Sequence, residues 1–278
     1  MTRIDAHQHF WALERGDYGW LTPELKTIYR DFLPNDLAPL LANHGINGTV
    51  LVQAAPTVAE TCFMLSLADE TPFIKGVVGW VDFEDPAAPE TIADLAADDA
   101  LVGLRPMIQD IEDVDWMLRD DLAPVFQALI NNDLTFDALT LPPHLPNLKT
   151  LLSRHPDMRV VIDHASKPFI RDQITEGWAQ DMTDLAGSTS AYCKVSGMVT
   201  EAAENWTTED LKPYVDHLLT CFGPDRLIWG SDWPVCTLAA TYDQWAKSTT
   251  SLLEGLSPDE IAAIMGGNAR AAYKLPND

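Results

Sequence analysis

Eight short apolar or β-branched segments recur along the chain, and each is followed by a longer segment with helical periodicity. Strands that alternate with helices in this way indicate parallel pairing, and eight such units in 278 residues have the size of a closed parallel barrel. The alternative, an open doubly wound sheet, usually carries a glycine-rich phosphate-binding turn, and the sequence has none. The sequence therefore predicts a (β/α)8 (TIM) barrel. The predicted strands are residues 4–10, 48–54, 74–81, 101–108, 134–140, 159–163, 191–196 and 227–230.

Helices are predicted between these strands and after the last one, because Asn, Asp or Pro stands at many starts and Gly after several ends. The predicted helices are residues 34–45, 56–67, 89–97, 123–131, 146–155, 175–185, 209–221, 241–253, and a final segment, 258–274, that is broken at Gly266 and Gly267. No linker, low-complexity tract or internal repeat divides the sequence. Residues 1–278 are therefore predicted to form a single domain.

The chain is strongly acidic, with 42 Asp and Glu against 18 Lys and Arg and a formal net charge of −24. Such a surface repels phosphate backbones and anionic lipids, so we expect no nucleic-acid partner and no membrane partner. The first residues resemble no secretory signal, and the sequence contains no apolar run long enough to span a membrane. Four scattered cysteines are typical of reduced thiols, and the predicted location is the cytoplasm.

Two histidines end the first predicted strand. In a barrel of this kind the functional residues lie at the carboxyl ends of the strands and in the loops that follow. Side chains alternate along a strand, so His7 and His9 are predicted to share a face while Gln8 points away. Two imidazoles in this arrangement can bind a divalent ion or polarise a carbonyl group, although two unrelated polar residues at a strand end would look the same.

Two further strands end in polar side chains that would reach the same mouth. The eighth predicted strand stops at Gly230, Ser231 and Asp232, and barrel closure places Asp232 beside the first strand. A carboxylate there can take a proton from water, although Ser-Asp is also ordinary turn chemistry. The sixth strand ends at His164, which supplies a third imidazole to the same pocket.

This combination of histidines and aspartate resembles the amidohydrolase superfamily, and further motifs resemble its branch of sugar-lactone hydrolases, which includes the L-fuconolactonases. These motifs are DAHQHFW at 5–11, YRDFLP at 29–34, VGLRP at 102–106, DHASKP at 163–168, KVSG at 194–197, GSDWP at 230–234 and GNAR at 267–270. The resemblance runs nearly end to end. It implies a barrel hydrolase that opens a lactone ring.

The sequence departs from the two-metal members of that superfamily at two strands. The fourth predicted strand carries no lysine and the fifth no histidine, so the ligands that such members use for a second ion are missing. The remaining set, His7, His9, His164 and Asp232, is sufficient for one zinc-like divalent ion or for a site without metal. The resemblance leaves these two alternatives open.

Five more residues are predicted to contact the substrate. Arg105 ends the fourth strand, where a guanidinium can polarise a carbonyl or bind sugar hydroxyls, and a plain salt bridge is the alternative. Arg30 and Trp20 belong to the loop after the first strand, Lys194 lies within the apolar seventh strand, and His144 lies in the loop after the fifth. An ion pair for Lys194 and a surface position for His144 are the competing interpretations.

The resulting hypothesis is the hydrolysis of a small lactone, most simply a sugar lactone, to its aldonic acid. Asp232 would act first as the base and then as the acid, while His7, His9 and His164 polarise the carbonyl. Three alternatives remain: a lactonase of an aromatic dicarboxylate, a metal-dependent decarboxylase of aromatic acids, and a sugar-binding barrel without catalysis. The sequence leaves open whether the protein is a monomer or a homo-oligomer.

Overall fold

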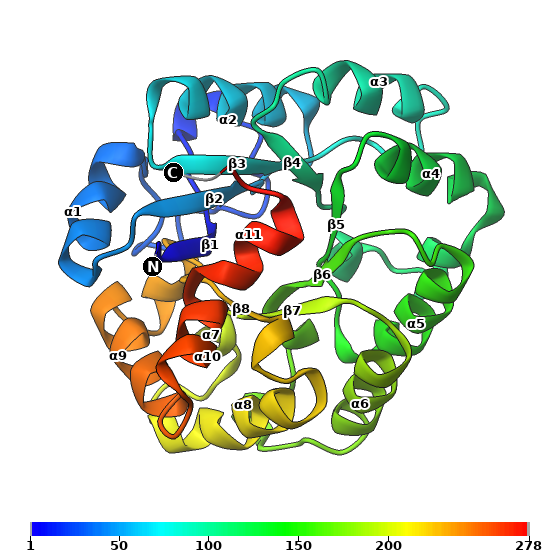
Figure 1. Cartoon of the computed structure of the whole chain (residues 1–278). Coiled ribbons are helices and arrows are strands. Elements are labelled where there is room, and N and C mark those ends of the chain that lie inside the picture. The colour runs from blue at the N-terminus through cyan, green and yellow to red at the C-terminus, as the bar shows by residue number, and fades with distance from the viewer. Residues whose placement is uncertain (1, 277–278) are drawn as a thin grey trace.

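The computed structural model describes residues 2–276 and shows eight strands in one parallel sheet, ordered β1-β2-β3-β4-β5-β6-β7-β8. The ends of this sheet meet, since the His9 amide donates to Trp233 O (2.7 Å) and the Asp232 amide donates to His7 O (2.7 Å). The predicted barrel is therefore confirmed (Figure 1). The strands are β1 Ile4–Gln8, β2 Gly48–Val52, β3 Ile74–Gly79, β4 Leu101–Leu104, β5 Thr135–Ala138, β6 Val160–Ile162, β7 Tyr192–Val195 and β8 Leu227–Trp229.

Helices form a ring around the sheet, and one helix lies across the barrel on the side that faces the viewer in Figure 1. That helix is α11, which follows a turn of π-helix, Ala263–Gly267, at the predicted break. The helices are α1 Pro34–His44, α2 Val58–Glu70, α3 Ala88–Leu95, α4 Ala123–Asn131, α5 Leu145–Arg154, α6 Trp178–Ser188, α7 Met198–Glu201, α8 Thr208–Phe222, α9 Tyr242–Leu252, α10 Pro258–Ala262 and α11 Asn268–Tyr273.

Most predicted strands extend too far at their carboxyl ends. The sequence predicts a first strand through Phe10 and a fourth through Ile108, whereas β1 ends at Gln8 and β4 at Leu104. The apolar pattern continues past these points because the loops after the strands also pack into the core, and Phe10 and Ile108 are both fully buried. Burial of a loop residue and burial of a strand residue look alike in a sequence.

The apolar core has two parts. The larger lies between the sheet and the surrounding helices, and the smaller fills the barrel interior with residues such as Ile4, Val50 and Val161. Tyr273 of α11 belongs to the interior part, so α11 closes one end of the barrel. The other end, where the strands finish, is left for polar side chains.

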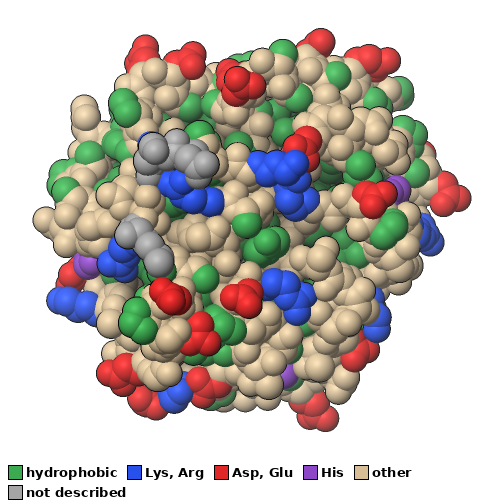
Figure 2. All heavy atoms as spheres, in the orientation of Figure 1, with side chains coloured by type: hydrophobic (Ala, Val, Ile, Leu, Met, Phe, Trp, Pro, Cys, Tyr) green, Lys and Arg blue, Asp and Glu red, His purple; other side chains and the backbone are tan. Residues whose placement is uncertain are grey.

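The face that carries α11 shows acidic side chains around much of its rim and several basic side chains nearer the middle (Figure 2). Among residues 2–276, no helix has the length and apolar character needed to cross a bilayer.

Candidate active site

Three imidazoles converge on one carboxylate at the carboxyl ends of the strands. The Oδ1 atom of Asp232 lies 3.3 Å from His9 Nε2, 3.8 Å from His7 Nε2 and 4.0 Å from His164 Nε2. All four residues are buried, with exposed fractions between 0% and 4%. The structure thus brings together the four residues that the sequence singles out as catalytic or metal-binding.

A bulge in β1 directs His7 into the barrel. The pairing of β1 with β2 shifts register between Asp5 and Gln8. In this interval two residues of β1, Ala6 and His7, lie opposite one residue of β2, Val50. Ala6 belongs to the interior core, and the adjacent His7 also points inward, where it contacts Lys194 and Asp163. In a regular strand, neighbouring side chains would point to opposite faces of the sheet. The bulge therefore lets both His7 and His9 face the site.

His164 and Asp232 have an unusual backbone conformation. His164, Ala165, Ser166 and Lys167 all have positive φ angles, between 50° and 55°, and so does Asp232, at 57°. The left-handed region costs a non-glycine residue about 1–2 kcal/mol, so this turn is held by its surroundings. Backbone strain concentrated on the site residues agrees with a functional role for them.

Two glycines allow the histidines to approach the backbone closely. A Cβ atom on Gly230 would lie 2.6 Å from His7 Cβ, and one on Gly197 would overlap the His164 ring. These contacts account for the glycines in two of the motifs found in the sequence, because a side chain at either position would displace an imidazole.

Hydrogen bonds orient two of the rings. His9 Nδ1 lies 2.8 Å from the carbonyl oxygen of Val52, which can only accept, so Nδ1 of His9 carries a hydrogen. His164 Nδ1 lies 2.9 Å from Ser196 Oγ, a hydroxyl that can donate to it. The Nε2 atoms of both rings are then turned toward Asp232.

Arg105 lies beside His7 and extends into the cavity. Its Nη2 donates to the carbonyl oxygen and the amide oxygen of Gln53, at 2.5 and 2.9 Å, and its Nη1 donates to Asp163 Oδ2 at 3.2 Å. The same Nη1 lies 3.2 Å from His7 Nε2. Its Nε is buried without a hydrogen-bond partner. Arg105 thus makes the salt bridge of the alternative interpretation, and its side chain also lines the cavity.

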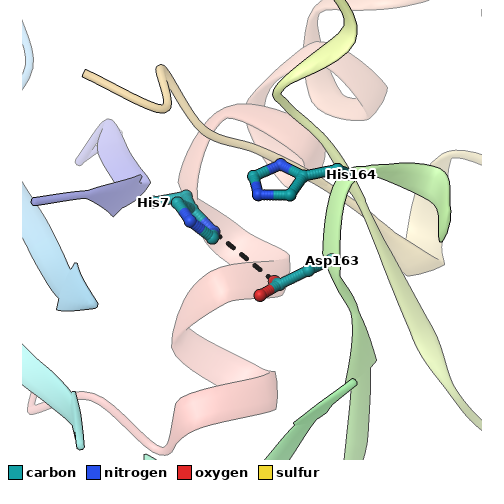
Figure 3. A group of neighbouring side chains, drawn as sticks. All are labelled: His7, Asp163 and His164. Carbon is teal, nitrogen blue, oxygen red and sulfur yellow. Dashed lines mark ion pairs between the residues drawn. The ribbon is translucent and has the colours of Figure 1, made fainter. Parts of the chain in front are cut away.

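A buried ion network lies on the other side of His7. The ammonium of Lys194 lies 2.6 Å from Asp137 Oδ2, 2.8 Å from Asp163 Oδ1 and 3.1 Å from His7 Nδ1. Tyr273 donates to Asp137, at 2.8 Å to Oδ2. Figure 3 shows Asp163 turned toward His7, with the His164 ring above this pair. Lys194 is fully buried and does not line the cavity, so its position does not support the predicted contact with substrate.

Burial and charge set the protonation of these groups. Burial alone would raise the pKa of Asp232, but His164 and the other histidines hold the pKa of that carboxyl well below its usual value. Burial lowers the pKa of His164 to about 4, and burial together with the Lys194 charge lowers the pKa of His7 well below 6.5. Asp232 is therefore ionised, and His7 and His164 are neutral, at neutral pH.

A cavity of about 200 Å³ opens above this cluster. Trp20, predicted from the sequence, is part of its wall and is fixed by an Nε1–H bond to Ala54 O at 2.7 Å. Lys167 was missed by sequence reasoning, although it stands in the DHASKP motif and the left-handed turn brings it to the cavity. The lining residues are His9, Trp20, Ala54, Arg105, Met107, Gln109, Asp110, Leu139, His164, Lys167, Thr200, Asp232 and Val235.

Two predicted substrate contacts lie elsewhere. The Arg30 side chain is 54% exposed, pairs with Asp36 at 3.2 Å and stacks on Phe32 at 3.7 Å, outside the cavity lining. His144 is buried, but its Nδ1 accepts from the amide of Leu141 (3.0 Å) within its own loop. The structure supports neither as a substrate contact, because a loop's path across the barrel mouth is not encoded in its local sequence.

Three residues of the predicted ligand set lie close enough together to bind a single divalent ion. His7, His9 and Asp232 bring one ligand atom each within 4.8 Å of one another. His9 donates Nδ1–H to a backbone carbonyl, which is the usual second contact of a metal-bound histidine and leaves its Nε2 lone pair toward Asp232. A lone pair and a carboxylate 3.3 Å apart favour a cation or a proton between them.

Comparison with known proteins identifies the family of the chain. A family model described as Amidohydrolase matches residues 4–275. An L-fucono-1,5-lactonase of Burkholderia ambifaria is 44% identical over 98% of this chain and 96% of its own length, and one of Burkholderia multivorans is 38% identical over 99% and 96%. A crystal structure of a Burkholderia multivorans amidohydrolase with bound zinc superposes with a TM-score of 0.94, at 36% identity, over 99% of this chain and 100% of that one. The chain belongs to the amidohydrolase family.

Proposed function

We propose that this protein hydrolyses the ring ester of a sugar lactone to the corresponding aldonic acid. The observation that carries the proposal is the convergence of His7, His9 and His164 on the ionised Asp232 at the floor of a small cavity. The two relatives named L-fucono-1,5-lactonase cover nearly the whole chain and support the same activity, with L-fucono-1,5-lactone as the first substrate to test.

Asp232 is the proposed base and acid. Its carboxylate takes a proton from a water molecule, whose oxygen then attacks the carbonyl carbon of the lactone. The tetrahedral intermediate collapses with cleavage of the bond between that carbon and the ring oxygen. The proton held by Asp232 passes to the departing ring oxygen, which leaves a hydroxyl group and a carboxylic acid in the opened product.

Neighbouring groups stabilise the charge that develops on the carbonyl oxygen. The guanidinium of Arg105 is held by Gln53 and Asp163 and reaches the cavity, so it needs little reorganisation during the reaction. His7 and His164 can add N–H donors from the floor. A divalent ion held by His9 and Asp232 would supply Lewis-acid polarisation of the same carbonyl.

The upper wall of the cavity has the chemistry to bind sugar hydroxyls. Trp20 offers an aromatic face, while Gln109, Lys167 and Thr200 offer an amide, an ammonium and a hydroxyl. The Oε1 atom of Gln109 is buried without a hydrogen-bond partner, so an arriving hydroxyl would satisfy it.

The alternative substrates receive less support. A lactonase for an aromatic dicarboxylate would need more than one arginine in its cavity, and within residues 2–276 Arg105 is the one arginine that lines it. The solved structures of decarboxylases and of a 2-pyrone-4,6-dicarboxylic acid hydrolase that superpose on the chain are 15–22% identical, which supports the fold alone.

The test is a pH-indicator screen of the purified protein on aldonolactones, with L-fucono-1,5-lactone first, run with and without a chelator. Acid release above the spontaneous rate from sugar lactones is the expected result. A parallel assay with 2-pyrone-4,6-dicarboxylate and aromatic acids covers the other two reactions. Turnover of these compounds but of no sugar lactone would reject the proposal, and stabilisation by a sugar lactone without turnover would favour a binding protein.

A further inference from the structure

We infer that Lys194 is a positioning residue that fixes the proton of His7 on Nε2, so that His7 turns an N–H group, not a lone pair, toward Asp232. The inference depends on the proposed function only in that Asp232 is the reacting carboxylate. Lys194 lies on β7 and is fully buried, and it does not line the cavity. Its effect on the reaction must therefore pass through another residue.

The contacts of the ammonium define what it requires of His7. An ammonium group can donate three hydrogen bonds and can accept none. Nζ of Lys194 donates to Asp137 Oδ2 at 2.6 Å and contacts His7 Nδ1 at 3.1 Å, and its third neighbour, Asp163 Oδ1 at 2.8 Å, is an ion-pair partner without a hydrogen bond. The carboxylates compensate the charge. The contact with His7 is attractive only if Nδ1 of His7 carries the lone pair, because an N–H there would oppose an ammonium hydrogen.

Arg105 makes the opposite demand on the same ring. Its Nη1 lies 3.2 Å from His7 Nε2, and that contact is a hydrogen bond only if Nε2 carries the lone pair. A doubly protonated His7 would turn an N–H group toward both cations, so the ring is neutral and carries one hydrogen. The two contacts of His7 therefore cannot both be hydrogen bonds.

Access to the cavity decides between them. Arg105 lines the cavity, so a hydrogen that His7 does not accept can bond to water or to the substrate. Lys194 does not reach the cavity, so water or substrate cannot replace His7 as its acceptor. Leaving an ammonium hydrogen without an acceptor in the barrel interior would destabilise the fold by about 1–3 kcal/mol. The contact with Lys194 is therefore kept, and His7 carries its hydrogen on Nε2.

Asp163 does not reverse this assignment. Its Oδ1 lies 3.4 Å from His7 Nδ1 (Figure 3), farther than the 2.8 Å between that oxygen and Lys194. Burial alone would raise the pKa of Asp163, but Lys194, His7 and Arg105 hold that pKa well below its usual range. Asp163 is therefore an anion that Lys194 and Arg105 already compensate.

The two histidines of β1 and its following loop then have different roles. His9 donates through Nδ1 and turns an Nε2 lone pair to the cavity, where a proton or a metal ion can bind. His7 accepts through Nδ1 and turns an Nε2–H group toward Asp232, whose Oδ1 lies 3.8 Å away, where the hydrogen favours the ionised carboxylate. Because the lone pair of His7 is on Nδ1 and contacts Lys194, His7 is not expected to be a metal ligand.

Nuclear magnetic resonance of the purified full-length protein, labelled with 15N at histidine, tests the inference directly. Long-range 1H–15N correlation separates a protonated ring nitrogen from an unprotonated one, and a His7→Gln variant assigns the His7 signals. The expected result is an unprotonated Nδ1 and a protonated Nε2. A protonated Nδ1 with an unprotonated or metal-bound Nε2 would overturn the inference.

A variant then tests whether Lys194 is the cause. Lys194→Met keeps an unbranched side chain and removes the donors, so the His7 hydrogen is expected to move to Nδ1, next to Asp163. Lys149→Met is the matched control, since Lys149 pairs with Asp184 on the surface, and it should leave the His7 signals unchanged. A folded Lys194→Met protein that keeps the hydrogen on Nε2 would contradict the role.

If Lys194→Met does not fold, the spectrum of the unsubstituted protein still decides the tautomer. The lactone screen is a separate measurement. A protein with no lactone turnover but an Nε2–H on His7 would reject the proposed function and leave this inference standing.

Discussion

Two opposing influences on the pKa of Asp232 decide how strong a base it is. Its low pKa keeps it ionised, yet a carboxylate with a low pKa is a weak base in water. Burial is the largest influence on this group and raises its pKa, while the histidines lower it. A substrate that displaces water from the cavity adds to the burial effect, so we expect Asp232 to become a stronger base when the lactone binds.

The pH dependence of kcat/KM follows from the neutral state of His164. Burial lowers the pKa of His164 to about 4, and a protonated His164 would bind Asp232 as an ion pair and remove the base. We expect kcat/KM to be level between about pH 5 and pH 7 and to fall below about pH 4. Initial rates, corrected for spontaneous hydrolysis, measure this profile. An acidic limb centred near pH 6.5 would contradict the assigned state of His164.

Arg105 should not tolerate the conservative change to lysine. Arg105→Lys keeps the charge, but one ammonium cannot bond to Gln53 and Asp163 and also reach the cavity as the guanidinium does. We expect kcat/KM to fall about 100-fold, as for a displaced catalytic group. Arg30→Lys is the control, since Arg30 lies outside the cavity lining. Equal kinetics for Arg105→Lys and the unsubstituted protein would refute the role of Arg105.

At the scale of elements, much of the site could be predicted because its residues lie at the carboxyl ends of the strands or within three residues after them. His7, His164, Arg105 and Asp232 were all found in this way. The bulge in β1 and the left-handed turn at Lys167 could not be predicted, since both depend on tertiary packing and neither contains a glycine. Arg30 was misplaced for a related reason, because its loop turns it toward Phe32.

Glu60 connects α2 to the cavity wall. It is the third residue of α2, and its buried carboxylate accepts from the amides of Ala54 and Ala55, just after β2. Ala54 lines the cavity and also accepts from Trp20. Burial raises the pKa of Glu60 to about 7. The position of Trp20 thus depends on a carboxylate whose ionisation is costly.

This raised pKa predicts a pH-dependent stability. A carboxyl whose folded pKa of about 7 exceeds its unfolded value of 4.5 stabilises the fold fully below pH 4.5, and this stabilisation is lost as the pH rises through 7. The difference corresponds to about 3 kcal/mol. Glu60→Gln should flatten the fall in unfolding free energy between about pH 5 and pH 8. Urea denaturation at several pH values measures it, and parallel curves for both proteins would contradict the assignment.

At the scale of the whole molecule, two polar connections hold the barrel together. At the seam between β8 and β1, Asp5 accepts from the Ser231 amide at 2.7 Å and from the Tyr242 hydroxyl at 3.0 Å. At the closed end, Tyr273 of α11 reaches Asp137 and through it Lys194 and His7. The first connection joins β1 to the last third of the chain and the second joins β5 to it, so neither part is complete without the other.

We expect the chain to unfold as one unit for this reason. Thermal unfolding followed by far-ultraviolet circular dichroism and by tryptophan fluorescence should give coincident single transitions. This outcome would support the predicted single domain. Two separated transitions would show that part of the barrel folds independently.

The central claim is that Asp232, set among three histidines from β1, the loop after it and the end of β6, carries out the chemistry. Asp232→Asn keeps the size of the side chain and removes the base, so it tests this claim most directly. We predict that kcat for L-fucono-1,5-lactone, or for the best lactone found in the screen, falls about 1,000-fold while the circular dichroism spectrum is unchanged. A folded Asp232→Asn protein whose kcat stays within a few-fold of the unsubstituted protein would contradict the account.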